Sequence, residues 1–175
     1  MVESIENIPL AQLVAKAEQS KEEGKNALFF DKQGNVDTFF TYKAHLIEMH
    51  KIPLQMTLGR DLKTVLEPVR KQTVGSMRQG ETMVLAYGTV APHFSEWRNS
   101  SFFDPELLFD FPNWRKDESF MKVVTAEDTA NTGGVFVCQE RFNIAVTSTY
   151  TDDEAMHAFI ANLPHKDQFN IYIVS

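Results

Sequence analysis

The fold is decided by the stretch Ala27-Leu28-Phe29-Phe30-Asp31-Lys32-Gln33-Gly34-Asn35-Val36-Asp37-Thr38-Phe39-Phe40. It opens with an apolar run, residues 27–30, of the length and composition of a buried strand. A polar loop with one glycine, Gly34, follows. Beyond it, apolar residues recur at steps of three and four, which predicts a helix over residues 38–51. This is the strand–loop–helix unit of a parallel α/β sheet.

Similar units follow along the chain. Apolar runs predict buried strands at residues 82–86, 143–148 and 169–174, and a short second strand at residues 54–58 after Pro53. Helical spacing predicts helices over residues 8–23 and 62–79, the second capped by Asp61, stopped by Gly80 and kinked or broken at Pro68. A further helix opens at residues 152–154. Shorter strands are predicted at residues 122–126 and 135–140.

The alternation predicts an α/β fold, a three-layer domain with a mainly parallel sheet. Residues 1–24 are interpreted as an N-terminal helix and linker, and residues 25–175 as one α/β domain. Within it, residues 91–122 form an excursion rich in proline and aromatic side chains. No internal repeat or change of composition indicates a second domain.

Composition and charge narrow the classes of function. The chain has 175 residues, 43% of them hydrophobic, and a net charge of −7. This charge argues against a dedicated nucleic-acid or anionic-membrane surface, because both need clustered lysine and arginine. The one cysteine, Cys138, lies in an apolar run and is interpreted as a core residue of a protein in a reducing compartment. With no signal peptide and no membrane-length apolar stretch visible, we expect a cytoplasmic protein.

The segment at residues 31–38 resembles the phosphate loop (Walker A) of the P-loop NTPases, in particular the AAA-like ATPases. The working motif, G-x-x-x-x-G-K-[ST], wraps phosphate in backbone N–H groups and reaches it with a lysine. With Thr38 in the hydroxyl position, Asp31 and Val36 replace the two glycines and Asp37 replaces the lysine. Only Gly34, a glycine in many ATPase versions of the loop, and Thr38 fit. The resemblance is therefore to a degenerate P-loop.

The same resemblance extends to two later strands. Residues 82–86 are similar to a Walker B strand, but Tyr87 and Gly88 stand where the carboxylates should be. Residues 142–148 are similar to a sensor strand, whose last polar residue here is Thr147 or Ser148. The resemblance implies that Gly34, Thr38 and Thr147 are the cofactor-binding residues if a nucleotide binds at all. The lost carboxylates and lysine imply that there is no cofactor and no hydrolysis.

Other interpretations of the same residues remain open. The segment at residues 29–35 is also compatible with a plain strand and a Gly/Asn turn, in another α/β domain with Rossmann-like layering or in a mixed α+β fold. An acid–base site can be built only from His93, Asp31, Asp37 and Ser95, since loops at strand carboxyl ends hold ligands in open α/β sheets. The five histidines show no metal-binding spacing, and no catalytic residue is assigned.

Function is predicted by elimination. The preferred hypothesis is a non-catalytic module for protein interaction or structure, a subunit of a larger assembly of, for example, cytoskeletal or ciliary type. The alternatives are a nucleotide-binding protein, kinase or ATPase with an atypical loop, and a small α/β enzyme centred on the His93 loop. Other proteins are the expected partners, rather than nucleic acid, membrane or a small molecule. Aromatic and arginine side chains anchor interfaces, so the predicted contacts are Trp97, Arg98, Phe102, Phe103 and Trp114.

Overall fold

The computed structural model describes residues 4–150 and 152–175, and in these residues six strands form one parallel sheet. The strands are β1 (Ile5–Ile8), β2 (Asn26–Phe30), β3 (His45–Glu48), β4 (Thr82–Ala86), β5 (Asn143–Ser148) and β6 (Phe169–Val174). Their order across the sheet is β1-β6-β2-β5-β4-β3, and every neighbouring pair is parallel. The predicted α/β fold with a mainly parallel sheet is confirmed.

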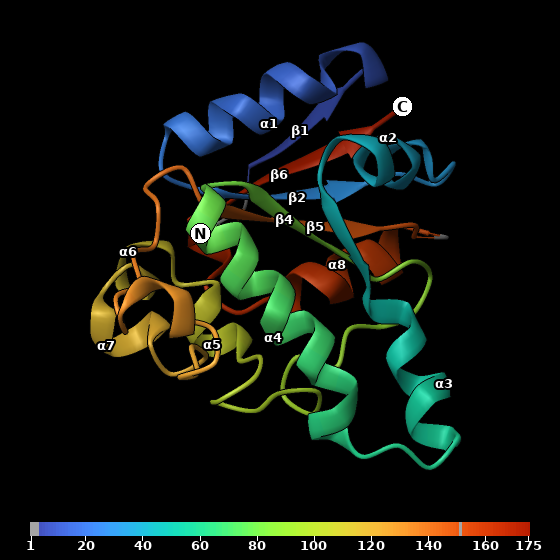
Figure 1. Cartoon of the computed structure of the whole chain (residues 1–175). Helices are drawn as coiled ribbons and strands as arrows, with labels where there is room; N and C mark the ends of the chain where they lie inside the picture. The colour runs from blue at the N-terminus through green and yellow to red at the C-terminus, as the bar shows by residue number, and fades with distance from the viewer. Residues whose placement is uncertain (1–3, 151) are drawn as a thin grey trace.

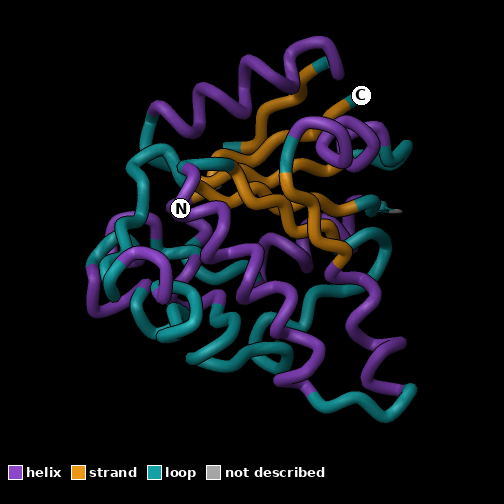
Figure 2. Tube along the Cα trace, in the orientation of Figure 1, coloured by secondary structure: helices purple, strands orange, loops and turns teal. Residues whose placement is uncertain are grey.

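Helices cover both faces of this sheet, which makes the three layers visible in Figures 1 and 2. The main helices are α1 (Leu13–Glu22), α2 (Asn35–Lys43), α3 (Ile52–Thr57), α4 (Leu62–Gln79) and α8 (Asp153–Asn162). Helices α1 and α2 bury Leu13, Val36 and Phe40 with Phe29 on one face. Helices α4 and α8 bury Leu66 and Phe159 on the other face. The central strands β2 and β5 are buried along their whole length for this reason.

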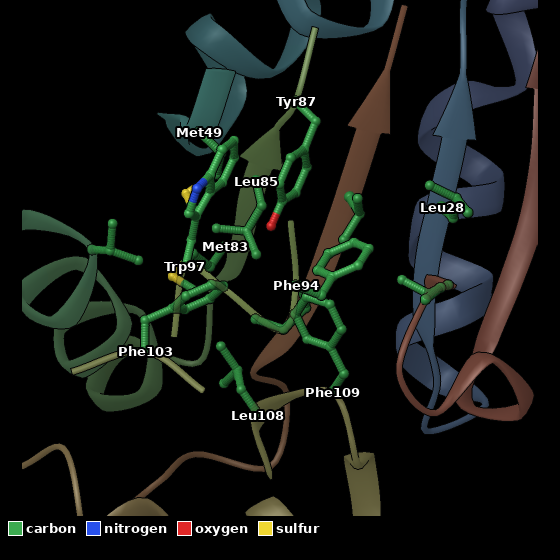
Figure 3. Close-up of a cluster of buried hydrophobic side chains, with 14 of the residues drawn as sticks. Leu28, Met49, Met83, Leu85, Tyr87, Phe94, Trp97, Phe103, Leu108 and Phe109 are labelled. Carbon is green, nitrogen blue, oxygen red and sulfur yellow. The ribbon is translucent and has the colours of Figure 1, made fainter. Parts of the chain in front are cut away.

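The excursion between β4 and β5 packs into the core on the α4 side. The predicted excursion at residues 91–122 is part of a longer connection, residues 87–142, which is called the excursion from here on and contains the short helices α5 (Pro105–Leu108), α6 (Phe111–Trp114) and α7 (Asp117–Phe120). The Phe109 ring contacts Phe94 at 5.8 Å and Phe169 of β6 at 5.3 Å between ring centroids. The indole N–H of Trp114 donates to the Met77 sulfur at 3.3 Å. Figure 3 shows the rings of Phe94 and Phe109 against the strands.

Helix α4 follows the prediction closely at its ends. The Asp61 carboxylate accepts the N–H of Thr64 at 2.8 Å, and Gly80 ends the helix with a left-handed φ of 70°. Pro68 lies inside the helix on an exposed position without ending it. The kink or break predicted there does not divide the helix.

The prediction was wrong for residues 44–58. The helix after the loop ends at Lys43, and β3 follows, paired with β4 from His45 to Glu48. A four-residue edge strand is too short to show a period of its own, so the helical spacing of its apolar residues is misleading. Residues 54–58, predicted as a strand, begin in α3, where Pro53 occupies the first turn rather than marking a stop.

Three further differences lie outside the central strands. Within residues 1–24, interpreted as helix and linker, β1 pairs with β6 and extends the sheet. Residues 122–126 and 135–140, predicted as strands, lie outside the sheet. Both segments belong to the excursion, and both edges of β5 are already occupied by β2 and β4. The neighbouring strand β5 therefore has no free edge with which these segments could pair, whatever their local β propensity.

Candidate functional site

The sheet has a topological switch point between β2 and β5. The connection after β2 leads to α2 on one face, and the connection after β5 leads to α8 on the other face. In open α/β sheets the crevice outside the carboxyl ends of two such strands is where ligands bind. The loop at residues 31–34 and the residues after β4 and β5 lie at this edge.

The loop amides at this edge are bonded to the chain itself. One Asp31 carboxylate oxygen accepts the N–H of Gln33 and the other accepts the N–H of Val36, both at 2.9 Å. The Asp31 side chain is buried, and its own N–H donates to the Ser148 carbonyl at 3.0 Å. Gly34 takes a left-handed φ of 74° to begin α2. An internal carboxylate thus takes the backbone donors that a bound phosphate would use.

Asp37, aligned with the P-loop lysine, contacts the predicted sensor residue. The Thr147 hydroxyl donates to the Asp37 carboxylate at 2.5 Å. Burial raises the pKa of Asp37 above its ordinary value, the Thr147 bond works against this, and the nearby charges of Asp31 and Glu48 add to the rise. The charges of Asp31 and Glu48 thus already disfavour the ionised form of Asp37, and a phosphate anion would be repelled in the same crevice.

His50 lies at the end of β3 beside this acidic group. Its Nδ1 lies 3.3 Å from the Ala86 carbonyl oxygen, and its Nε2 lies 3.5 Å from a carboxylate oxygen of Glu48. Gly88 packs on the same ring, since a Cβ there would come within 3.3 Å of His50 Cγ. A cavity of about 490 Å³ is lined by Asp37, Glu48 and His50. Sequence reasoning missed His50 because it assigned residue 50 to a helix.

The residues predicted to bind a cofactor lie at this edge but have their own partners. The Thr38 hydroxyl donates to the Gly34 carbonyl at 3.2 Å, inside the first turn of α2. The Thr147 hydroxyl is bonded to Asp37. Gly34 gives the chain its turn into α2. The hydroxyls that would coordinate a metal ion and sense a γ-phosphate are thus occupied by intramolecular bonds.

The acid–base site predicted around His93 is not supported by the contacts of that residue. The His93 ring lies 4.8 Å from the Trp97 ring centroid and its Nδ1 lies 3.4 Å from Glu96. Within residues 4–150 and 152–175, no hydrogen bond or ion pair joins it to Asp31, Asp37 or Ser95. Asp31 and Asp37 do lie at one edge, but the histidine beside Asp37 is His50.

The predicted aromatic contacts are mostly core residues. The side chains of Trp97, Phe103 and Trp114 are 7%, 2% and 2% exposed, and Phe102 is half-buried. Arg98 is exposed and lies 3.9 Å from Asp104. The excursion therefore covers the sheet with its own rings, as Figure 3 shows for Trp97 and Phe103. The buried rings of the excursion form an internal layer, so an interface has to be sought elsewhere on the surface.

Comparisons with known proteins add no family. No protein-family model, no curated protein and no solved structure matches the chain. Within the described residues, no three His, Cys, Asp or Glu side chains gather as metal ligands would. Over the same residues, none of the helices has the length and apolar character needed to cross a bilayer.

Proposed function

We propose that this chain is a non-catalytic module for protein interaction, built on a degenerate P-loop NTPase-like scaffold and acting as a cytoplasmic subunit of a larger assembly. The observation that carries the proposal is the Asp31 carboxylate, which accepts the loop N–H groups of Gln33 and Val36. A phosphate group could take these donors only after displacing a buried carboxylate. The loop thus resembles a phosphate-binding loop in its backbone, but its N–H donors are not available to a phosphate.

Two further features support the scaffold and the loss of chemistry. The three strands similar to the phosphate-loop, Walker B and sensor strands are the adjacent strands β2, β4 and β5, and their carboxyl ends meet at one edge. At that edge Asp37 bonds Thr147, so the lysine position and the sensor position contact each other. With Tyr87 and Gly88 after β4, this edge lacks the carboxylates that hold Mg²⁺ in the working enzymes.

Nucleotide titration tests the first half of the proposal. Calorimetric titration of the full chain with Mg-ATP, Mg-GTP and ADP is expected to detect no binding with a millimolar or smaller dissociation constant. The Asp37→Lys variant is expected to remain without affinity, because Asp31 still fills the loop. A micromolar dissociation constant for either protein would overturn the proposal. Pairing Asp37→Lys with Asp31→Ala is expected to give the first detectable phosphate binding, since two amides and a cation are then free.

The second half of the proposal, that the chain is a subunit of a larger assembly, is tested by the size at which the protein elutes from extracts of its own cells. A subunit of a larger assembly is expected to elute well above a dimer, which has twice the chain mass of 20.0 kDa, together with other proteins in fixed ratio. Elution only as a monomer or as a dimer, with no accompanying protein, would contradict the proposal.

A further inference from the structure

A further cavity opens at the edge of the sheet opposite the crevice. Its volume is about 410 Å³, and Ser4 and Lys25, which come just before β1 and β2, line it together with Phe169 and Ile171 of β6. In a parallel sheet these are the amino ends of the strands, whereas the crevice lies at their carboxyl ends. A ligand in this cavity would therefore not compete with anything bound in the crevice.

Asn170, the second residue of β6, leaves an unused acceptor at this cavity. Its amide nitrogen donates to the Ser20 hydroxyl at 2.9 Å and to the Glu23 carboxylate at 3.0 Å. The buried Ser20 hydroxyl also bonds the Tyr172 hydroxyl at 3.2 Å, so this network ties α1 to β6, which lie side by side in Figure 1. Both bonds of Asn170 use the nitrogen, and within residues 4–150 and 152–175 its carbonyl oxygen accepts no hydrogen bond.

Glu23 holds a charged carboxylate beside this amide. Its oxygens accept from Asn170 at 3.0 Å and from Gln19 at 2.7 Å, and these bonds hold the pKa of Glu23 below its ordinary value. Both donors are neutral, and in the described part of the chain no cation lies within the 4.0 Å of an ion pair. An ammonium group has three donors, and Glu23 with the free Asn170 oxygen supplies acceptors for it.

Lys25 provides the opposite charge. It is half-buried and lines the cavity, and among the described residues no carboxylate lies within ion-pair distance of its ammonium group. Its charge helps to lower the pKa of Glu23, so the two groups lie near each other without direct contact. The cavity thus offers one unpaired carboxylate and one unpaired ammonium group, two residues apart in the chain.

The remaining charged side chains leave the balance of the cavity unchanged. Glu6 lines it but pairs with Lys16 at 2.8 Å. Lys166 and Asp167 contribute one charge of each sign. A ligand with a single net charge would therefore satisfy only one side of the cavity, whereas a dipolar ion would satisfy both.

We propose that this cavity binds a free α-amino acid with an apolar side chain. The ammonium group of the ligand lies against Glu23 and the Asn170 carbonyl oxygen, and its carboxylate lies against Lys25. An α-amino acid carries its two charges on neighbouring atoms, as groups two residues apart require, and Phe169 and Ile171 supply apolar surface for its side chain. The inference goes beyond the proposed function and does not rest on it, because it concerns the other edge of the sheet.

Three matched ligands test the two charges. The isotope-labelled full chain is titrated with leucine, with isopentylamine, which is leucine without its carboxylate, and with isocaproate, which is leucine without its ammonium group. Nuclear magnetic resonance is expected to show that leucine shifts the Asn170 side-chain amide and the backbone N–H of residues 23–25 in a saturable way. The dissociation constant is expected to be millimolar, because Glu23 is exposed to water. Each analogue is expected to bind about tenfold more weakly or worse, since one charged hydrogen-bonding group is missing.

Variants assign each charge to its residue. Lys25→Met is expected to weaken leucine binding about tenfold and to leave isopentylamine binding unchanged, while Glu23→Gln is expected to weaken leucine and to leave isocaproate unchanged. The matched controls are Glu22→Gln and Lys32→Met, which are exposed and outside the cavity and are expected to bind leucine as the wild type does. The analogues decide the question without any variant if Lys25→Met does not fold. Leucine that shifts none of these resonances, analogues that bind as tightly as leucine, or an equal loss in the controls would each overturn the proposal.

Discussion

At the scale of single residues, two carboxylates define the crevice at the end of β2 and β5. Asp31 bonds the N–H groups of Gln33 and Val36 and so acts as an internal anion at the start of α2. Asp37, in the first turn of the helix, accepts a hydrogen bond from Thr147 and has a raised pKa because of its burial. The chain thus supplies its own negative charge where a phosphate-binding protein would receive a ligand.

Asp37 gives the stability of the protein a testable pH dependence. Its folded pKa lies above the unfolded value, so its contribution is fully present below about pH 4 and is lost as the pH rises through the folded pKa. Asp37→Asn keeps an oxygen for Thr147 and removes the charge. Urea unfolding is expected to show that the variant gains stability relative to wild type as the pH rises from about 4 to about 7.

Thr147→Val is the matched control for this series. It removes the hydroxyl that stabilises the charged form of Asp37, so the loss of stability with rising pH should become steeper than in wild type. A flat difference between Asp37→Asn and wild type across the whole range would contradict the raised pKa.

At the scale of elements, α4 is fixed to the excursion by a buried arginine. Arg70 is 4% exposed and bonds Glu67 at 2.7 Å, Asp128 at 2.6 Å and the Val123 carbonyl at 2.8 Å. Its bond lowers the pKa of Glu67. Burial alone would raise the pKa of Asp128, but the bonds from Arg70 and Thr125 outweigh it and hold the pKa below its ordinary value.

Arg70→Met is expected to lower the free energy of unfolding by about 3 kcal/mol at neutral pH, because it leaves the largely buried Asp128 carboxylate without its ion-pair partner. Both carboxylates have depressed pKa values, so their contribution is present above about pH 4.5 and is lost as the pH falls through the folded values. The difference between variant and wild type should therefore shrink in acid. Lys71→Met, on the exposed neighbouring position, is the control and should change stability by less than about 0.5 kcal/mol. An equal loss in both variants would show that Arg70 contributes no more than a surface cation.

At the scale of the whole molecule, the sequence predicts the strands that are buried on both faces of the sheet. The strands β2, β4, β5 and β6 are apolar runs and were predicted with their ends almost correct. The edge strands β1 and β3 were missed because each has four residues and exposes half or more of them, so neither run nor alternation is present. The hydrogen bonds of Asp31 could not be predicted from the sequence for another reason, since they depend on the backbone path of the loop. The only signal in the sequence is that an aspartate side chain often accepts the backbone N–H two residues further along, in a turn.

The last prediction concerns whether sheet and excursion unfold together. Both tryptophans, Trp97 and Trp114, lie in the excursion, so their fluorescence reports on it, while the far-ultraviolet circular dichroism is dominated by the longer helices such as α1, α4 and α8. Because the excursion shares one buried cluster with the sheet, the two signals are expected to give the same urea midpoint. Phe109→Leu, at a fully buried ring between Phe94 and Phe169, is expected to shift both midpoints by the same amount. A fluorescence transition at lower urea, or a shift of that transition alone, would mean that residues 87–142 form a separate cooperative unit. The aromatic layer would then cover the sheet without stabilising it.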